Sequence, residues 1–276
     1  MDPATADALA HLLVTALLLV LAGTVAGVVA GLLGIGGGIV TVPALFYVFG
    51  TLGVADEARM HLAVGTSLAL IVPTALSSAR AHHARGAVDF SILRRWAPPM
   101  LLGVVLGTLL ASQVDGRVLS LTFAGVAMLV AATMLFGRPQ GQERTPSKWL
   151  DGLAAAAIGA VSVMVGVGGG AIVVMTLSLL GYAIHRAIGT AAALGLVVAV
   201  PGAIGFALTG LEAPGRTAYC LGYLHLPAIA FMLPAVLLAA PLGVRLAHRL
   251  KPRPLRIAFA LFMLMVAGRM IWELSV

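Results

Sequence analysis

The sequence contains little charge. Only 10% of its 276 residues are Asp, Glu, Lys or Arg, whereas 61% are hydrophobic. A soluble domain carries about 25% charged residues, so this chain lacks the polar side chains needed to cover a surface that faces water. The mean hydropathy of +1.07 agrees with this composition. These absences exclude an ordinary soluble domain and indicate a protein that crosses a membrane several times.

Cysteine and long basic stretches are also scarce. Cys220 is the one cysteine, which excludes an intramolecular disulfide and a metal cluster held by cysteines. The net charge is +7. Lys and Arg in short polar segments between apolar runs are typical of loops that face anionic lipid. We therefore expect a lipid bilayer around the chain, no nucleic-acid partner, no metal and no cofactor.

Long uncharged runs predict membrane-spanning helices, because about 20 apolar residues cross a bilayer. The runs and the breaks between them give five helical elements in each half of the chain. In order, they are 8–30, 34–50, 61–79, 96–113 and 117–137, then 149–165, 168–182, 186–210, 225–245 and 254–272. The second element of each half is short and begins in glycine. The expected fold class is an all-α polytopic membrane protein of eight to ten spans.

The two halves of the chain resemble each other. "GIGGG" at 34–38 returns as "GVGGG" at 166–170, a shift of 132 residues, and "HLAVGT" at 61–66 returns as "HRAIGT" at 185–190, a shift of 124. Further along, a constant shift of 136 relates many identical residues. Shared residues at consistent spacing indicate an internal duplication.

A hydrophilic stretch divides the repeats. We expect an N-terminal transmembrane repeat at 1–137, a cytoplasmic linker at 138–148 and a C-terminal transmembrane repeat at 149–276. The loop at 80–95 is strongly basic, whereas in its counterpart at 216–231 the only Lys or Arg is Arg216. By the positive-inside rule, equivalent loops of opposite bias lie on opposite sides of the membrane. The sequence therefore predicts two inverted-topology repeats, which require an odd number of crossings in each half. With five crossings in each half, both termini lie outside; if the two short elements re-enter without crossing, the count becomes even and the argument for inversion fails.

The repeated glycine motifs are candidate binding sites. Adjacent glycines interrupt a helix, and the freed N–H groups at membrane depth must face protein or a wet cavity. A helix that restarts there directs its positive dipole end toward the break, which suits an anion. Close helix packing by small residues is the alternative. The candidate substrate-binding glycines are Gly34, Gly36, Gly37, Gly38, Gly166, Gly168, Gly169 and Gly170.

Hydroxyl and imidazole side chains complete the candidate set. Uncharged hydroxyls can donate to an anion, although in membrane helices they often bond to preceding carbonyls of their own helix. His61 and His185 open the second repeated motif and are possible proton carriers, the alternative being an interfacial position at a helix start. The spans contain almost no Asp or Glu, which disfavours a cation carrier. The candidate hydroxyls are Thr41, Thr66, Ser67 and Thr190.

The stretches "GLLGIGGGIVTVPAL", "HLAVGTSL", "GVGGGAIVVMTL" and "HRAIGTAAALG" resemble the TauE/SafE sulfite exporter family, also called TSUP. The resemblance covers nearly the whole chain. It implies a carrier in the bacterial inner membrane for sulfur-containing anions such as sulfite, sulfonates (sulfoacetate among them) or other organosulfur acids, usually exported. The second half departs from the pattern, since Met175 stands where the first half has Pro43 and Ala191 stands where it has Ser67.

Taken together, these features predict a secondary transporter that works by alternating access of its two halves. A carrier for another small carboxylate or oxyanion is the alternative. A membrane-embedded enzyme is disfavoured because the chain has no H-E-x-x-H motif, cysteine cluster or buried Asp pair. A scaffold subunit is disfavoured because it would not need mirrored polar breaks.

Overall fold

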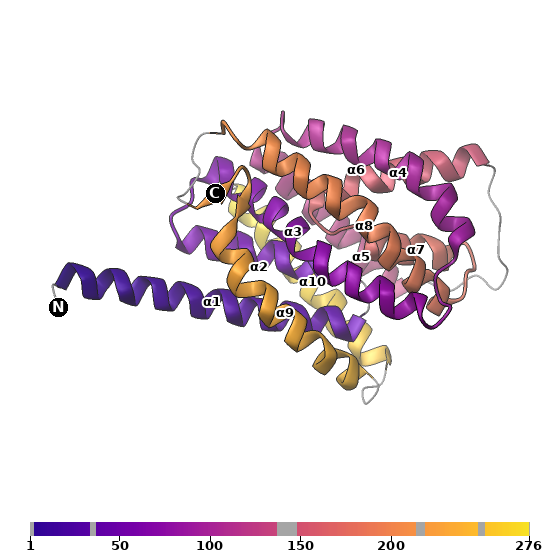
Figure 1. Cartoon of the computed structure of the whole chain (residues 1–276), viewed down its shortest axis with the longest axis horizontal. Helices are drawn as coiled ribbons and strands as arrows, with labels where there is room; N and C mark the ends of the chain where they lie inside the picture. The colour runs from indigo at the N-terminus through magenta and orange to yellow at the C-terminus, as the bar shows by residue number, and fades with distance from the viewer. Residues whose placement is uncertain (1–2, 34–36, 137–147, 214–218, 248–251, 276) are drawn as a thin grey trace.

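The computed structural model describes residues 3–33, 37–136, 148–213, 219–247 and 252–275. These ranges form ten helices and one short strand pair (Figure 1). The helices are α1 Pro3–Leu33, α2 Gly38–Thr51, α3 Asp56–His83, α4 Phe90–Ala111, α5 Gly116–Phe136, α6 Lys148–Val165, α7 Gly170–Leu179, α8 Ile184–Thr209, α9 Leu226–Ala247 and α10 Pro252–Ser275. The antiparallel strands β1 Cys220–Leu221 and β2 Leu224–His225 precede α9. Each predicted helical element corresponds to one observed helix.

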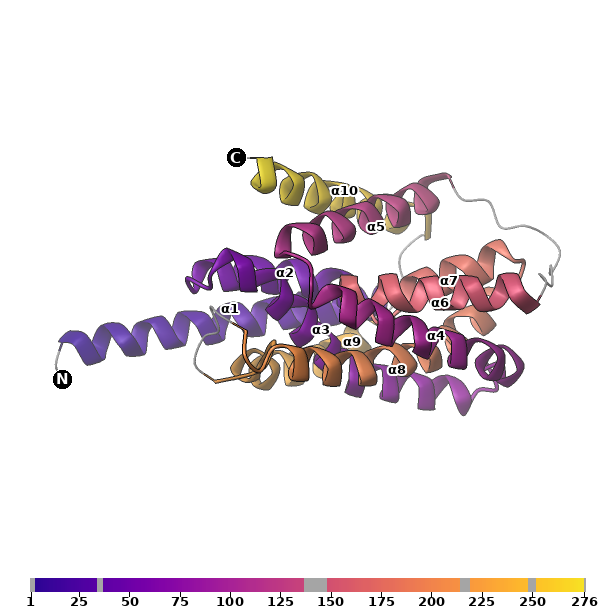
Figure 2. The same cartoon turned by 90° about the horizontal axis from the view of Figure 1, so that it is seen from above.

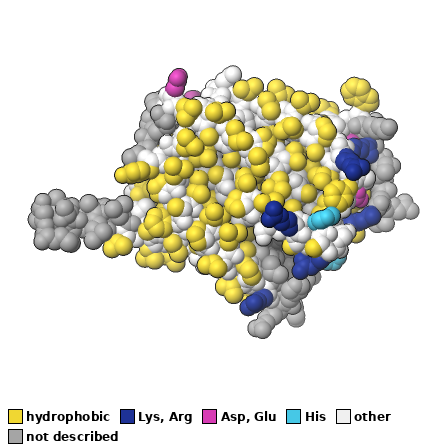
Figure 3. All heavy atoms as spheres, in the orientation of Figure 1, with side chains coloured by type: hydrophobic (Ala, Val, Ile, Leu, Met, Phe, Trp, Pro, Cys, Tyr) yellow, Lys and Arg dark blue, Asp and Glu magenta, His cyan; other side chains and the backbone are white. Residues whose placement is uncertain are grey.

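The surface of the bundle is apolar. Among the described residues, six helices are long and apolar enough to cross a membrane: α1, α3, α5, α8, α9 and α10. Many of their leucines are exposed, and hydrophobic side chains cover most of the face shown in Figure 3. Lys and Arg side chains gather toward one end of that face. This distribution confirms the prediction of an all-α polytopic membrane protein.

Helices α2 and α7 are too short to cross the bilayer. They contain 14 and 10 residues. At a rise of about 1.5 Å per residue they span roughly 21 and 15 Å, against a hydrocarbon core of about 30 Å. Helix α7 begins two residues later than predicted, because Gly168 and Gly169 adopt φ angles of +65° and +76° and cannot continue a right-handed helix. As regular helices, both are therefore shorter than the hydrocarbon core.

Glycines bring the first helix of each half against the fourth helix of the other. In the α1–α9 contact, a Cβ added to Gly27 would lie 2.6 Å from the Val236 carbonyl oxygen. In the α4–α6 contact, a Cβ on Gly107 would lie 2.6 Å from the Ala160 carbonyl oxygen. Without a Cβ, the backbones approach closely enough for dispersion contacts to hold the helices together. The scattered glycines of these helices therefore serve packing.

Helices α3 and α8, which carry the second repeated motif, lie side by side and antiparallel. Gly65 of α3 packs against Phe206 of α8, and farther along α3 the side chain of Ala75 approaches Gly195. Helices α5 and α10 pair on one side of the bundle (Figure 2). The core between the helices includes Phe49, which is fully buried. The two halves are thus interleaved throughout the bundle.

The ends of the chain lie at the same end of the bundle (Figures 1 and 2). Charged residues mark helix ends: Asp56 and Glu57 lie in the first turn of α3, and Arg80 lies in its last turn. Negative charges at the start of a helix and positive charges at its end interact favourably with the helix dipole. The predicted linker lies outside the described residues, apart from Lys148, which begins α6.

Candidate functional site

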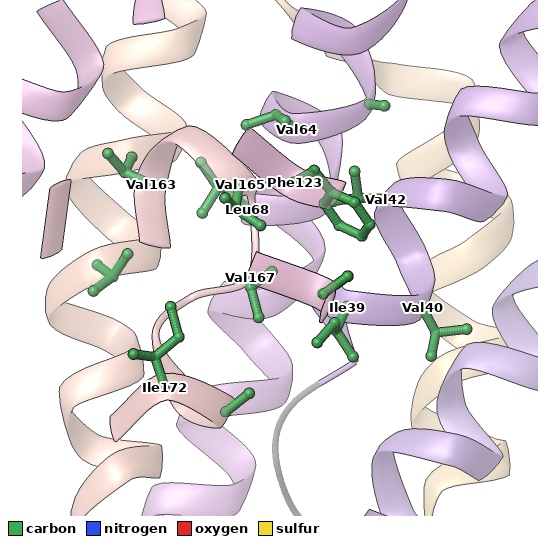
Figure 4. Packing of buried hydrophobic residues seen from close by; sticks show 14 of the residues in the cluster. Ile39, Val40, Val42, Val64, Leu68, Phe123, Val163, Val165, Val167 and Ile172 are labelled. Carbon is green, nitrogen blue, oxygen red and sulfur yellow. The ribbon is translucent and has the colours of Figure 1, made fainter. Parts of the chain in front are cut away.

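Gly38, one of the two described residues of the first glycine motif, packs directly against the second glycine motif. We call residues 34–38 the first break and residues 166–170 the second break. A Cβ added to Gly38 would lie 2.6 Å from the Gly166 carbonyl oxygen and 2.8 Å from Val167 Cα. Figure 4 shows Val167 beside Ile39, the second residue of α2. Segments more than 120 residues apart in the sequence therefore meet inside the protein.

The backbone of the second break requires glycine. Gly166, Gly168 and Gly169 have φ angles of +71°, +65° and +76°, a region that costs other residues about 1–2 kcal/mol each. Gly37, by contrast, has an ordinary φ of −73°. Two of the predicted site residues, Gly34 and Gly36, lie outside the described residues. The described part of the site is therefore best defined at the second break.

The start of α7 presents unpaired N–H groups. Gly169 is the residue before the helix, and its carbonyl accepts the N–H of Val173 at 2.8 Å. Within the described residues, the N–H groups from Gly168 to Ile172 donate to no carbonyl or side chain. Such groups carry the positive end of the helix dipole. In the described part of the chain, these donors are mostly buried and have no acceptor.

The hydroxyls of Thr41 and Ser67 are engaged by the breaks themselves. Thr41 Oγ1 donates to the Gly37 carbonyl oxygen at 2.9 Å, within its own helix. Ser67 Oγ donates to the Gly166 carbonyl oxygen at 2.8 Å, across the contact between the halves. Each hydroxyl has a single proton to donate. In this structure the two side chains therefore stabilise carbonyl groups of the breaks.

Thr66 and Thr190 occupy equivalent places at opposite junctions. The backbone N–H of His225 donates to Thr66 Oγ1 at 3.0 Å, and the N–H of Asp89 donates to Thr190 Oγ1 at 2.9 Å. Asp89 and His225 correspond to each other under the shift of 136 residues. Both threonines are fully buried. Each therefore joins its helix to the segment that starts the fourth helix of one half.

The two candidate proton carriers differ in environment. His61 is 5% exposed, and its Nδ1 and Nε2 lie 3.2 and 3.0 Å from the carbonyl oxygens of Glu57 and Ala111. A neutral imidazole can donate to only one of these oxygens. Helix α3 begins five residues before His61, so this histidine is not at the helix start as predicted. His185 lies in the first turn of α8 and is exposed.

Ser162 of α6 is a polar residue that the sequence reasoning missed. Its side chain is fully buried, and its hydroxyl has no hydrogen-bond partner among the described residues. A Cβ added to Gly169 would lie 3.5 Å from Ser162 Oγ. Under the shift of 132 residues, Ser162 corresponds to Ala30 of the first half, so the repeat gave no signal for it. The second half therefore has one hydroxyl that the first half lacks.

Two helix-capping groups carry shifted pKa values. Burial opposes the ionisation of Asp89, but hydrogen bonds from Ser91 and Ile92 and the charge of Arg186 outweigh it and lower the pKa of this carboxyl. Burial lowers the pKa of His225, and its Nδ1 accepts the N–H of Ala228 at 3.1 Å. Both groups therefore remain hydrogen-bond acceptors near neutral pH.

One ion pair joins α4 to α6. Arg95 Nη2 lies 2.5 Å from Asp151 Oδ2. The Asp151 side chain is 6% exposed and the Arg95 side chain is 35% exposed. A buried carboxylate needs such a partner. This pair therefore secures the helix contact, away from the breaks.

An apolar helical bundle that contains two interrupted helices in buried contact has the architecture of a membrane transporter. Residues 19–270 match the family described as sulfite exporter TauE/SafE. The chain therefore belongs to this family. The family resemblance seen in the glycine motifs is confirmed.

Proteins of similar sequence carry transporter names. A probable membrane transporter protein of Haemophilus influenzae is 34% identical over 256 residues, which cover 92% of this chain and 97% of that protein. One of Methanocaldococcus jannaschii is 23% identical over 251 residues, covering 87% and 89%. One of Xylella fastidiosa is 33% identical over 153 residues, covering 53% and 56%. The chain is thus a multi-pass membrane transporter with a small-molecule substrate, and not an enzyme.

Proposed function

We propose that this transporter exports small sulfur-containing anions, such as sulfite, sulfonates and other organosulfur acids, across the bacterial inner membrane. The observation that carries the proposal is the buried contact between the two glycine breaks. Beside that contact, α7 directs from its N-terminus N–H groups that have no acceptor among the described residues. Backbone donors of this kind suit an anion. The name of the family agrees with a sulfur oxyanion.

The mechanism we propose is alternating access of two inverted repeats. Three sets of contacts support it. The antiparallel course of α3 and α8 is expected for equivalent helices of inverted repeats. The α1–α9 contact has its counterpart in α6–α4. The Thr66–His225 hydrogen bond likewise has its counterpart in Thr190–Asp89. Rocking one set of helices against the other would open each side of the breaks in turn.

The membrane potential supports export as the direction of transport. Under the positive-inside rule, the basic loop after α3 supports a cytoplasmic position for its end of the bundle. A negative charge that leaves a cell with a negative interior gains about 2.3 kcal/mol per 100 mV. Export can therefore proceed without a coupled ion, and His61 is the buried candidate if protons are coupled.

Anion-induced stabilisation tests this proposal. Purified protein would be heated with sulfite, thiosulfate, sulfoacetate, taurine, sulfate or acetate at equal ionic strength. A ligand that binds the folded state raises the unfolding midpoint with its occupancy. We expect the midpoint to rise with sulfite or a sulfonate and not with acetate. If no anion shifts the midpoint of protein shown to be folded, the proposal fails.

A further inference from the structure

A buried hydroxyl without a partner lies at the start of α7. Ser162 Oγ is fully enclosed, yet it forms no hydrogen bond with the described residues. Such a group is costly to bury unless something pairs with it. The nearest feature is Gly169, whose added Cβ would lie 3.5 Å from this oxygen. The hydroxyl therefore faces the break where α7 begins.

The same place holds a set of backbone donors. The N–H groups from Gly168 to Ile172 have no acceptor among the described residues. Helix α7 is ten residues long, enough to give its N-terminus a partial positive charge. Two independent features, the side-chain hydroxyl and the helix N-terminus, therefore lack the same thing, which is a hydrogen-bond acceptor.

The surroundings are apolar. The atoms closest to added Cβ atoms at Gly168 and Gly169 include side-chain carbons of Ile71 and Val198. The donors are therefore dipoles set in an apolar shell. Dipoles can replace the hydration of a single charge, but the cost of removing an ion from water rises steeply with its charge. Such a place favours a head group with one negative charge.

We infer that Ser162 and the N-terminal N–H groups of α7 bind the oxygen atoms of the substrate head group, and that this subsite prefers singly charged head groups. A sulfonate or hydrogen sulfite fits, whereas sulfate, with two charges on one head group, is disfavoured. This inference rests on the proposed anion transport and adds a residue and a charge preference to it.

The first half has no equivalent side chain. Ala30 occupies the position that corresponds to Ser162, and its Cβ lies 3.4 Å from a Cβ added to Gly37. The hydroxyls of the first break are already donated to carbonyl groups, as Thr41 and Ser67 illustrate. The described residues therefore provide one head-group subsite, which belongs to the second half.

Binding of methanesulfonate and sulfate to the full-length protein tests the inference. Dissociation constants would be measured by calorimetry at equal ionic strength for the wild type, Ser162→Ala and Ser178→Ala. Ser178 is the matched control, because its hydroxyl also lacks a partner among the described residues but lies at the other end of α7. Unfolding midpoints without anion would be recorded for all three.

We expect the wild type to bind methanesulfonate at least about tenfold more tightly than sulfate. Loss of one hydrogen bond to a charged group should weaken methanesulfonate binding by about 10- to 100-fold in Ser162→Ala. Ser178→Ala should bind as the wild type does. Without anion, Ser162→Ala should unfold no earlier than the wild type, because it loses no internal hydrogen bond.

Three results would overturn the inference: unchanged methanesulfonate binding in Ser162→Ala, a lowered midpoint of this variant without anion, or tighter binding of sulfate by the wild type. These results leave anion transport itself intact. If the wild type binds neither these anions nor sulfite, the proposed function fails together with the subsite.

Discussion

Replacing Gly38 with alanine should disrupt the contact between the two breaks. Alanine suits the first position of α2, so the backbone conformation adds no penalty. The new Cβ would lie 2.6 Å from the Gly166 carbonyl oxygen and 2.8 Å from Val167 Cα. Both are backbone atoms that cannot rotate away. Overpacking of this kind costs about 1–3 kcal/mol.

The neighbouring residue provides the matched control. A Cβ on Gly37 would meet nothing closer than 3.4 Å, an ordinary contact. Gly37→Ala should therefore change the free energy of unfolding by less than about 0.5 kcal/mol. The assay is the unfolding midpoint of each variant, purified in the same detergent. Equal midpoints for Gly38→Ala and Gly37→Ala would refute the packing of the two breaks described above.

Three further predictions concern other parts of the structure. Gly169→Ala should lower the unfolding midpoint, because a φ of +76° costs alanine about 1–2 kcal/mol; an unchanged midpoint would contradict the left-handed conformation. The pKa of His225 is lowered, and its Nδ1 accepts the N–H of Ala228 only while it is unprotonated. The contribution of His225 to the free energy of unfolding should therefore be complete above about pH 6.5 and decline as the pH falls below that value. His225→Asn keeps a hydrogen-bond acceptor that does not titrate, so its unfolding midpoint should change less with pH between about pH 8 and 5 than that of the wild type. An equal pH dependence in the two proteins would exclude His225 as the source of the effect. Arg95→Ala should lower the unfolding midpoint more than Asp151→Ala does. The Asp151 carboxylate, 6% exposed, would then be buried without a partner or water, whereas the Arg95 guanidinium, 35% exposed, can be hydrated when its partner is removed. The reverse order of the two midpoints would contradict the ion pair described between α4 and α6.

The helices could be predicted because their signals are local. Uncharged runs and the breaks between them predicted ten elements, and ten helices form in the described residues. The second glycine motif located the start of α7 to within two residues, since no other residue combines small size with freedom at positive φ. The predicted start of the second element, at 34, lies outside the described residues, and α2 begins at Gly38. The start of α3 was missed by five residues, because the charged first turn at Asp56 and Glu57 lies outside the apolar run.

The use of each polar side chain could not be predicted, because its partner is distant in the sequence. Ser67 bonds to a carbonyl 99 residues away, and Thr66 accepts an N–H 159 residues away. The motif predicted hydroxyl donors to an anion; in the structure the Ser67 proton is donated to a carbonyl oxygen of the other half, and Thr66 Oγ1 accepts an N–H from the other half. Conversely, Ser162 lies in an apolar helix with no motif of its own, and only the fold places it beside Gly169.

Efflux from liposomes tests the central claim most directly. Purified protein would be reconstituted into vesicles loaded with sulfite or sulfoacetate, with the membrane potential set by a potassium gradient and an ionophore. We expect anion efflux to be faster than from protein-free vesicles, and faster again when the vesicle interior is negative. Efflux equal to that of protein-free vesicles for both anions, with protein shown to be folded and inserted, would contradict it.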